Sequence, residues 1–322
     1  MPDSDQLWHA GSVTAWSDTF DEVHKFSNGI SSIGTGIRPL SLKNLFQHFL
    51  DDEIVAHGLQ VIHLTSMHLR LLLHPLQTLV CQYSQLLSCF SDSAVASTPQ
   101  NRALTAASTR VRLQEVQQLL GRWYDLAHRY VEATTMCPMM HANMAMFNLI
   151  SMNAVTNFPE IERLARREGE YGYPQQLSLV HKKCLFNAQE AIMHAGQILR
   201  VVREMPRAIR PPWWAGAVYR AALVLWANAF TNGDAIRAAQ QTVPSSKGYP
   251  VPLDQLPLDH DTIRKYMSRR EGLPTLTKRD GRSLSLDNTH TLLTHCIEVL
   301  DEGVATRFSD GIRNKLERLA QR

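Results

Sequence analysis

The sequence lacks the cysteine patterns that mark metal and redox sites. Its cysteines are few, odd in number and scattered along the chain: Cys81, Cys89, Cys137, Cys184 and Cys296. No two of them have the C-x2-C spacing of a zinc site or a thiol redox motif. This distribution indicates reduced, mostly buried thiols and excludes a zinc-finger module within this sequence.

A charge surplus, a membrane-spanning run and a nucleotide-binding loop are missing as well. Lys and Arg exceed Asp and Glu by only 33 to 30, without a dense basic run, so no nucleic-acid footprint is indicated. The most apolar windows, such as "VYRAALVLWANAF", are shorter than the roughly 20 residues that span a bilayer. The chain starts without an apolar signal region, and it has no Walker loop, dinucleotide fingerprint or G-x-S-x-G motif. We therefore expect a cytoplasmic protein without nucleic-acid or membrane partners.

Helical periodicity is what the sequence does contain. Hydrophobic residues make up 44% of the chain, which suits a sizeable core, and no alternation of strands with helices is visible. We predict an all-α fold, a single compact multi-helix array over residues 1–322, with a partly irregular segment at 1–40 and a loop at 92–108. Only "LPTLTKRDGRSLSL" is typical of a hairpin, with Asp280-Gly281 as its turn. The predicted helices cover about 41–70, 75–91, 109–135, 138–156, 159–169, 175–205, 214–240, 260–270, 288–302 and 308–321.

One predicted helix, residues 175–205, carries an unusual polar stripe. Five polar residues recur in it at spacings of four, three, four and three: Lys183, Asn187, Glu190, His194 and Gln197. These spacings place all five on one side of a helix. The stripe is either a solvated face or the polar wall of a pocket, which we expect the helices at 138–156 and 214–240 to complete.

Several stretches resemble a known family. They are "FNLISMNAVTNFPEIERLARREG", "EAIMHAGQILRVVREMPRAIRPPWWAGAVYRAALVLWANAF", "LPTLTKRDGRSLSLDN" and "GVATRFSDGIRNKLERLA". Over most of residues 140–322, the chain resembles the regulatory region that follows the zinc finger in fungal-specific transcription factors. The resemblance implies an all-helical regulatory domain. Because no finger is present in this sequence, the chain is either a domain severed from a regulator or a protein that reuses the scaffold.

A second resemblance favours reuse. The chain looks like the non-canonical humulene synthases of fungal tropolone sesquiterpenoid pathways, in which Mg²⁺ and an essential lysine bind farnesyl diphosphate. In that family a Leu or Met four residues before the lysine steers the product, and Leu179 and Lys183 have this spacing. The resemblance implies a Mg²⁺-dependent terpene cyclase that makes humulene from farnesyl diphosphate, with Lys183 as the catalytic residue and Leu179 against the prenyl chain.

Other residues take roles in this hypothesis by their chemistry. Asn187, Glu190 and Asn148 offer the oxygen ligands that Mg²⁺ prefers. Aromatic faces attract positive charge, so four aromatic residues are candidates to shield a carbocation: Phe147, Trp213, Trp214 and Trp226.

The alternatives stay open. Asn148 can simply satisfy a neighbouring backbone group, and Glu190, His194 and Gln197 also occur in the stretch that resembles the regulators, where they serve no cyclase. The rival hypothesis is a finger-less transcription-regulator domain that binds a protein or a small effector and catalyses nothing. A homodimer is compatible with both hypotheses.

Overall fold

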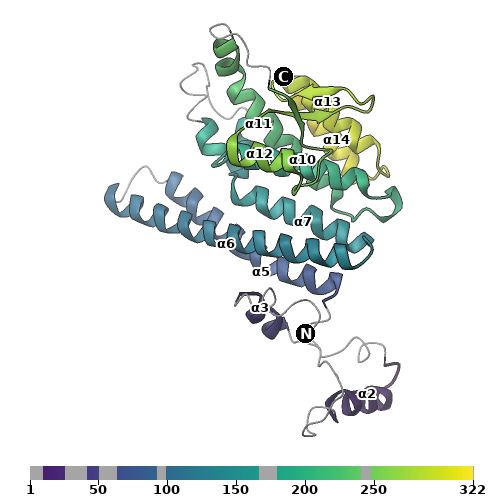
Figure 1. Cartoon of the computed structure of the whole chain (residues 1–322). Coiled ribbons are helices and arrows are strands. Elements are labelled where there is room, and N and C mark those ends of the chain that lie inside the picture. Colours follow the sequence, from purple (N-terminus) through teal and green to yellow (C-terminus); the bar gives the residue numbers. More distant parts are fainter. Residues whose placement is uncertain are drawn as a thin grey trace. The chain divides into compact units, whose positions relative to one another are not determined.

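The computed structural model describes residues 10–25, 42–50, 64–92, 99–166, 180–240 and 248–321 (Figure 1). These residues belong to two compact units. The first consists of Met1–Pro75 and Gly121–Thr135, and the second of Leu76–Leu120 and Met136–Arg322. The predicted all-α class is confirmed, although a small three-stranded sheet adds to the helices of the second unit.

The first unit holds α2 (Val13–Lys25), α3 (Leu42–Leu50), the start of α5 (Ser66–Asp92) and the end of α6 (Pro99–Ala133). Trp123 of α6 is fully buried, and its Nε1–H donates to the carbonyl oxygen of Leu69 in α5 at 2.8 Å. A buried indole N–H needs such a partner, so this bond fixes α6 against α5 within the unit.

Helix α6 begins at Pro99, inside the stretch 92–108 that we predicted as a loop. Proline is tolerated in the first turn of a helix because the N–H it lacks would have no partner there. The following "RALTAAS" contains three alanines, the best helix formers, so Ser and Thr in this stretch do not prevent a helix.

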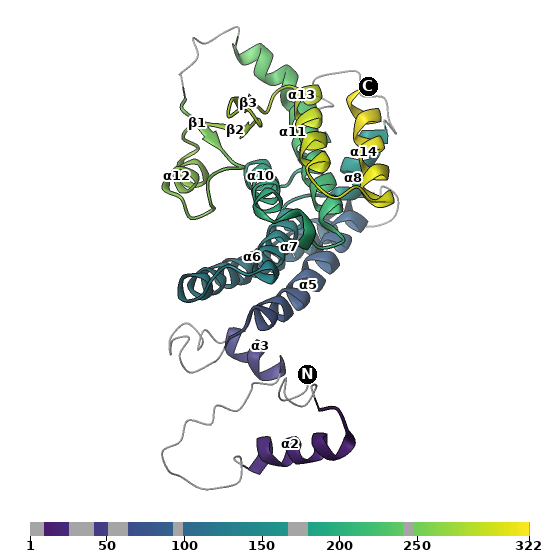
Figure 2. The same cartoon turned by 90° about the vertical axis from the view of Figure 1, so that its right-hand side faces the viewer.

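The second unit is built around α10 (Ala188–Glu204), which packs against α7 (Pro138–Ala154) and α11 (Trp214–Gln240). Figure 2 shows α10 beside α7, with α11, α13 (Thr289–Asp301) and α14 (Arg307–Ala320) on its other side. Helix α11 also packs against α8 (Phe158–Arg166), α13 and α14. A single turn of 3-10 helix, Arg207–Ile209, lies between α10 and α11.

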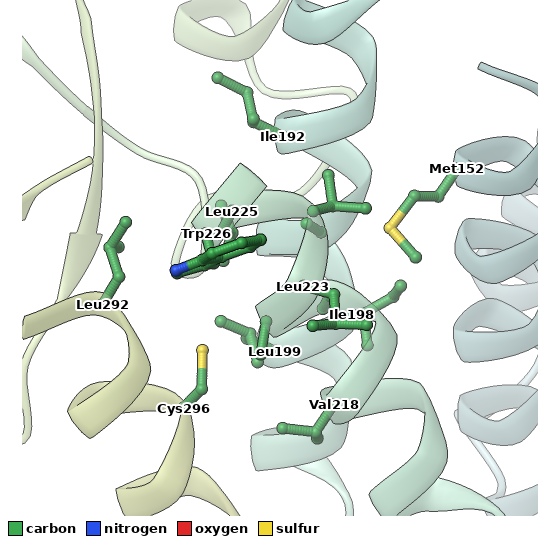
Figure 3. Packing of buried hydrophobic residues seen from close by; sticks show 14 of the residues in the cluster. Met152, Ile192, Ile198, Leu199, Val218, Leu223, Leu225, Trp226, Leu292 and Cys296 are labelled. Atoms are coloured by element: carbon green, nitrogen blue, oxygen red, sulfur yellow. The ribbon is translucent and has the colours of Figure 1, made fainter. Parts of the chain in front are cut away.

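The core of this unit is a continuous cluster of apolar side chains from these helices. In Figure 3, Trp226 of α11 lies beside Leu292 and Cys296 of α13, and Met152 of α7 reaches the opposite side of the cluster. Fully burying a large apolar side chain contributes about 1.5–3 kcal/mol, so this cluster provides much of the unit's stability.

The sheet has the order β1-β2-β3 and is formed by β1 (Pro250–Pro252), β2 (Leu273–Thr277) and β3 (Ser283–Ser285). Strand β1 runs parallel to β2, and α12 (Asp261–Arg269) connects them, whereas β2 and β3 form the predicted antiparallel hairpin. Gly281 in the hairpin turn has a φ of 80°, a conformation that glycine adopts without strain. We read 243–258 as loop, so β1 was not predicted.

The sheet is fastened to α10 by polar contacts. The side chain of Gln197 donates to the carbonyl oxygens of Leu253 and Leu256 at 2.9 and 2.7 Å. At Gly196, a Cβ would lie 2.5 Å from the Cβ of Leu253. The close approach of the two backbones therefore depends on the missing side chain.

The long helix predicted at 175–205 is interrupted. Among its described residues, 180–184 form one helical turn, and α10 starts only at Ala188. Between them, the backbone bonds to the end of α7: Asn157 N–H donates to Cys184 O, and Phe186 N–H donates to Val155 O, both at 2.8 Å. These hydrogen bonds replace the i to i−4 bonds of a continuous helix.

No helix in the described ranges combines the length and the apolar character that crossing a bilayer requires.

Candidate functional site

A pocket of about 990 Å³ lies within the second unit, at the N-terminal end of α10. Its wall combines α5, α6, the end of α7, the segment before α10, the start of α10, α11 and the end of α12. The lining residues are Leu87, Arg110, Leu113, Gln114, Gln117, Ala154, Val155, His181, Lys182, Leu185, Phe186, Asn187, Ala188, Gln189, Glu190, Ile192, Asn228, Tyr266 and Arg270.

Asn187 starts the helix that presents the site. It is the N-cap of α10, and its Oδ1 accepts a hydrogen bond from the backbone N–H of Glu190 at 3.3 Å. Its Nδ2–H in turn donates to Oε2 of Glu190 at 2.8 Å. The capping bond satisfies a backbone N–H that has no partner within the helix. The negative carboxyl group of Glu190 is also stabilised by the positive end of the helix dipole.

Glu190 is held from a second helix as well. Gln117 of α6 donates from Nε2 to Oε1 of Glu190 at 3.1 Å, although 73 residues separate the two in sequence. Burial raises the pKa of the Glu190 carboxyl group, and the hydrogen bonds from Gln117 and Asn187 oppose this rise. The Glu190 side chain is 23% exposed and lines the pocket, so a molecule in the pocket can reach it.

His194 lies one turn deeper and is buried. Its Nδ1 donates to Oδ1 of Asn148 at 2.8 Å, while Nδ2–H of Asn148 donates to the carbonyl oxygen of Met144 at 2.8 Å. Burial lowers the pKa of His194 to about 3, so the ring is neutral at physiological pH. Phe147 meets this ring edge-on, with ring centroids 5.8 Å apart.

The pocket has a surplus of positive charge. Among the described residues that line it, three are cations from three segments, Arg110, Lys182 and Arg270, and one is a carboxylate, Glu190. His181 adds no positive charge at neutral pH, because burial lowers its pKa despite a hydrogen bond with Asn228 that acts in the opposite direction. The lining therefore carries a net charge of about +2, three cations less one carboxylate, when Glu190 is ionised.

The polar stripe is only partly the wall of this pocket. Glu190 and Asn187 line it, whereas His194 and Gln197 point into the protein and bind α7 and the sheet segment. Lys183 is exposed and is not among the lining residues, because the break before α10 shifts it off the stripe; its neighbour Lys182 lines the pocket.

The remaining predicted residues are spread over the unit. Leu179 lies outside the described residues. Phe147 and Asn148 contact His194 behind the pocket, and none of the three tryptophans lines it. Trp214 is covered by the Arg210 guanidinium, 5.0 Å from its ring centre, and Trp226 stacks on Phe230. Trp213 is half-buried at the start of α11 and packs on the core.

The predicted magnesium ligands do not come together as a set. Asn187 and Glu190 meet in the pocket, but the oxygen of Asn148 is engaged by His194. Within the described ranges, no three His, Cys, Asp or Glu side chains gather where they could hold a metal ion. The Mg²⁺ ion stays a prediction.

Sequence reasoning missed the contributions of α6 and α12. Arg110, Gln117 and Arg270 lie far from α10 in sequence, and no local pattern pairs them with it. One signal was available: Asn187-x-x-Glu190 is the spacing of an N-cap and its N3 partner, and it marks the true start of α10.

Comparison with known proteins bears on the cyclase hypothesis. A protein of Zymoseptoria tritici named a transcription factor is 52% identical over an alignment of 338 residues, which covers 100% of this chain and 34% of the relative. Over its whole length, the chain resembles a fungal transcription factor. "Transcription factor 1" of Elsinoe fawcettii is 43% identical over 99% of the chain, and "Transcription factor PfmaH" of Pestalotiopsis fici is 33% identical over 98%. The chain spans about a third of the length of these relatives, 34%, 32% and 31% respectively.

Neither other comparison adds a match. No protein-family profile matches the chain, and no solved structure does.

The cyclase hypothesis is wrong. The curated relatives are named as transcription factors at up to 52% identity, and none of them is named a terpene cyclase, a humulene synthase or a lyase. The two-residue match at Leu179 and Lys183 was too small to outweigh similarity along the whole chain. Farnesyl diphosphate and Mg²⁺ were predicted only as the substrate and cofactor of this cyclase reaction.

Proposed function

We propose that this chain is a regulatory region of the fungal transcription-factor type, which acts by binding and not by catalysis. The observation that carries the proposal is similarity over the whole chain to proteins named transcription factors, at 52% and 43% identity. A catalytic activity that these relatives are not named for would be a large change of function for a chain of such high identity to them. Within this proposal, the pocket at the start of α10 is where a small effector binds.

The geometry of the pocket supports an effector site. Its volume of about 990 Å³ is at the upper end of the roughly 300–1,000 Å³ typical of small-molecule sites. Segments from α6, α7, α10, α11 and α12 meet there, so a ligand bound in it would contact several helices that lie far apart in the sequence. A ligand that prefers one arrangement of these helices shifts the population towards it.

A reporter assay tests this function. The full chain is fused to a heterologous DNA-binding domain in yeast, and transcription of a reporter with matching sites is compared with that of the DNA-binding domain alone. We expect a severalfold change in reporter output, either an increase or, on a pre-activated promoter, a decrease.

The controls separate regulation from poor expression. Fusion levels are compared by immunoblot, and a fusion to an unrelated helical protein of similar size shows the effect of bulk alone. A well-expressed fusion whose reporter output equals that of the DNA-binding domain on both promoters would contradict the proposal.

A further inference from the structure

We infer that the pocket at the start of α10 binds an organic anion with an apolar body, such as an aromatic carboxylate or sulfonate. The inference rests on the proposed function, because it names the chemical class of the effector. Its test below is a direct binding measurement, so the inference and the proposed function can fail separately.

The charges in the pocket converge from separate parts of the chain. Arg110 comes from α6, Lys182 from the turn before α10, and Arg270 from the C-cap of α12, where its backbone adopts a φ of 57°. In the part of the chain that the structure describes, no carboxylate forms an ion pair with any of the three. A concave surface lined by charge of one sign concentrates the field and attracts the opposite charge.

The carboxyl group of Glu190 does not cancel this preference. It is already engaged by Gln117 and Asn187, at 3.1 and 2.8 Å. Burial raises its pKa, and the hydrogen bonds from Gln117 and Asn187 oppose this rise. A hydroxyl or amide group of the ligand could bond to the same carboxyl group, so Glu190 adds a polar anchor beside the cations.

The apolar part of the wall indicates that the ligand carries an apolar group in addition to its anionic group. Phe186 lines the pocket with 42% of its surface exposed, and Leu113, Leu185 and Ile192, which are buried, line it as well. A large apolar side chain that stays exposed in a concave site gains free energy when a ligand covers it, and in this pocket that side chain is Phe186. An inorganic anion would use the cations alone, and a neutral hydrocarbon would use the apolar wall alone.

Two fluorescent probes of nearly the same shape test the inference. The first, 8-anilinonaphthalene-1-sulfonate, carries a sulfonate, and the second, N-phenyl-1-naphthylamine, has the same rings without charge. Each is titrated against the full chain, and the dissociation constant and stoichiometry are measured by fluorescence. We expect one saturable site for the sulfonate and binding at least about tenfold weaker for the neutral probe.

Matched variants assign the binding to this pocket. In the double variant Lys182→Met, Arg270→Met, the dissociation constant of the sulfonate should rise about tenfold, which corresponds to about 1.4 kcal/mol. The variant Lys183→Met removes an exposed lysine next to the pocket but outside its lining, and its dissociation constant should equal that of the parent. Melting temperatures and near-ultraviolet circular dichroism show that each variant is folded, because anilinonaphthalene dyes also bind loosened cores.

Three results would overturn the inference. The first is absence of saturable sulfonate binding by folded protein, the second is equal affinity for the neutral probe, and the third is equal loss of affinity in the Lys183 variant and the double variant. Reporter regulation without sulfonate binding would refute the ligand class and leave the proposed function standing. Sulfonate binding that needs Lys182 and Arg270, together with a silent reporter, would do the reverse.

Discussion

The guanidinium of Arg203 lies 2.7 Å from the carboxylate of Asp254, which is fully buried at the edge of the sheet. The backbone N–H of Thr277 also donates to this carboxylate at 2.8 Å, and the ring of His295 lies 3.7 Å from it. The contact joins α10, the segment after β1 and the end of β2, so one ion pair holds three parts of the second unit.

Arg203→Met should therefore destabilise the second unit. Breaking a buried ion pair leaves its partner charge uncompensated and costs about 3–5 kcal/mol, and we expect the lower end because the Arg203 side chain is 18% exposed. Urea denaturation measures the loss. The control is Arg313→Met, which removes an arginine that is 47% exposed and pairs with the exposed carboxylates of Glu317 and Asp301; it should cost less than about 1 kcal/mol. Equal losses in the two variants would contradict the importance of the buried pair.

Gly196→Ala should destabilise the protein, whereas Gly311→Ala should not. A Cβ at Gly196 would lie 2.5 Å from the Cβ of Leu253 and 3.0 Å from its backbone, so β1 and α10 would have to separate, at about 1–3 kcal/mol. A Cβ at Gly311, within α14, meets nothing within 4 Å, and alanine in a helix interior stabilises by about 0.5–1 kcal/mol relative to glycine. Opposite signs in the two unfolding free energies are the expected result, and a stabilised Gly196→Ala would refute the close approach.

Asn187→Ala should loosen the start of α10. Removing an N-cap side chain costs about 0.5–2 kcal/mol, and this cap also donates to Glu190. Asn187→Ser keeps a capping oxygen, so it should recover most of the loss in urea denaturation. If serine destabilises as much as alanine, the capping function of Asn187 is not the cause.

Stability should fall when the pH is lowered through the range in which His194 of an unfolded chain takes up a proton. The folded pKa is about 3 and the model value is 6.5, so between these values the unfolded state binds more protons than the folded state. Stability therefore rises with pH across this window. Lowering the pH from 6.5 to 5 should cost about 1.6 kcal/mol, because the full slope of about 1.36 kcal/mol per pH unit is reached only below pH 6.5. His194→Gln should flatten the rise of unfolding free energy with pH. His290 is exposed, so His290→Gln should leave this rise unchanged and serves as the control. Parallel pH profiles for parent and His194→Gln would rule out this origin.

The pKa of Glu190 predicts the opposite slope. Burial raises it above the model value of 4.5, so just above that pH the folded state holds the proton more tightly than the unfolded state. Its contribution to stability is present at low pH and is lost as the pH rises through the folded pKa. Glu190→Gln should remove this loss, which shows as a smaller fall in unfolding free energy as the pH rises. A larger fall in the variant would contradict the sign.

The helices could be predicted from the sequence where their signals are local. The apolar periodicity of α7, α11, α13 and α14 gave bounds within two residues of those observed, and Asp280-Gly281 identified the β2–β3 turn. The start of α10 was missed because the apolar pattern continues through the break. Backbone bonds from Asn157 and Phe186 to partners about 30 residues away decide that break, and periodicity does not contain them.

The site was less predictable than the fold for the same reason. Glu190 was identified from its helix position, but Gln117 lies 73 residues before it and Tyr266 76 residues after it. Lys183 was preferred to Lys182 because it has the Leu179–Lys183 spacing of the humulene synthase resemblance and a place in the stripe of a continuous helix, but the structure places Lys182 in the pocket lining. Parallel pairing of β1 with β2 likewise depends on a crossover through α12 that no short pattern specifies.

Helix α10 also has a mechanical consequence. Glu190, in its first turn, forms part of the pocket wall, and Arg203, in its last turn, grips the sheet through Asp254. Thirteen residues at 1.5 Å each make a stiff rod of about 20 Å between these two points. If the proposed ligand tilted the pocket end of this rod, the far end would move with it, so one helix without an intervening loop would link the pocket to the sheet.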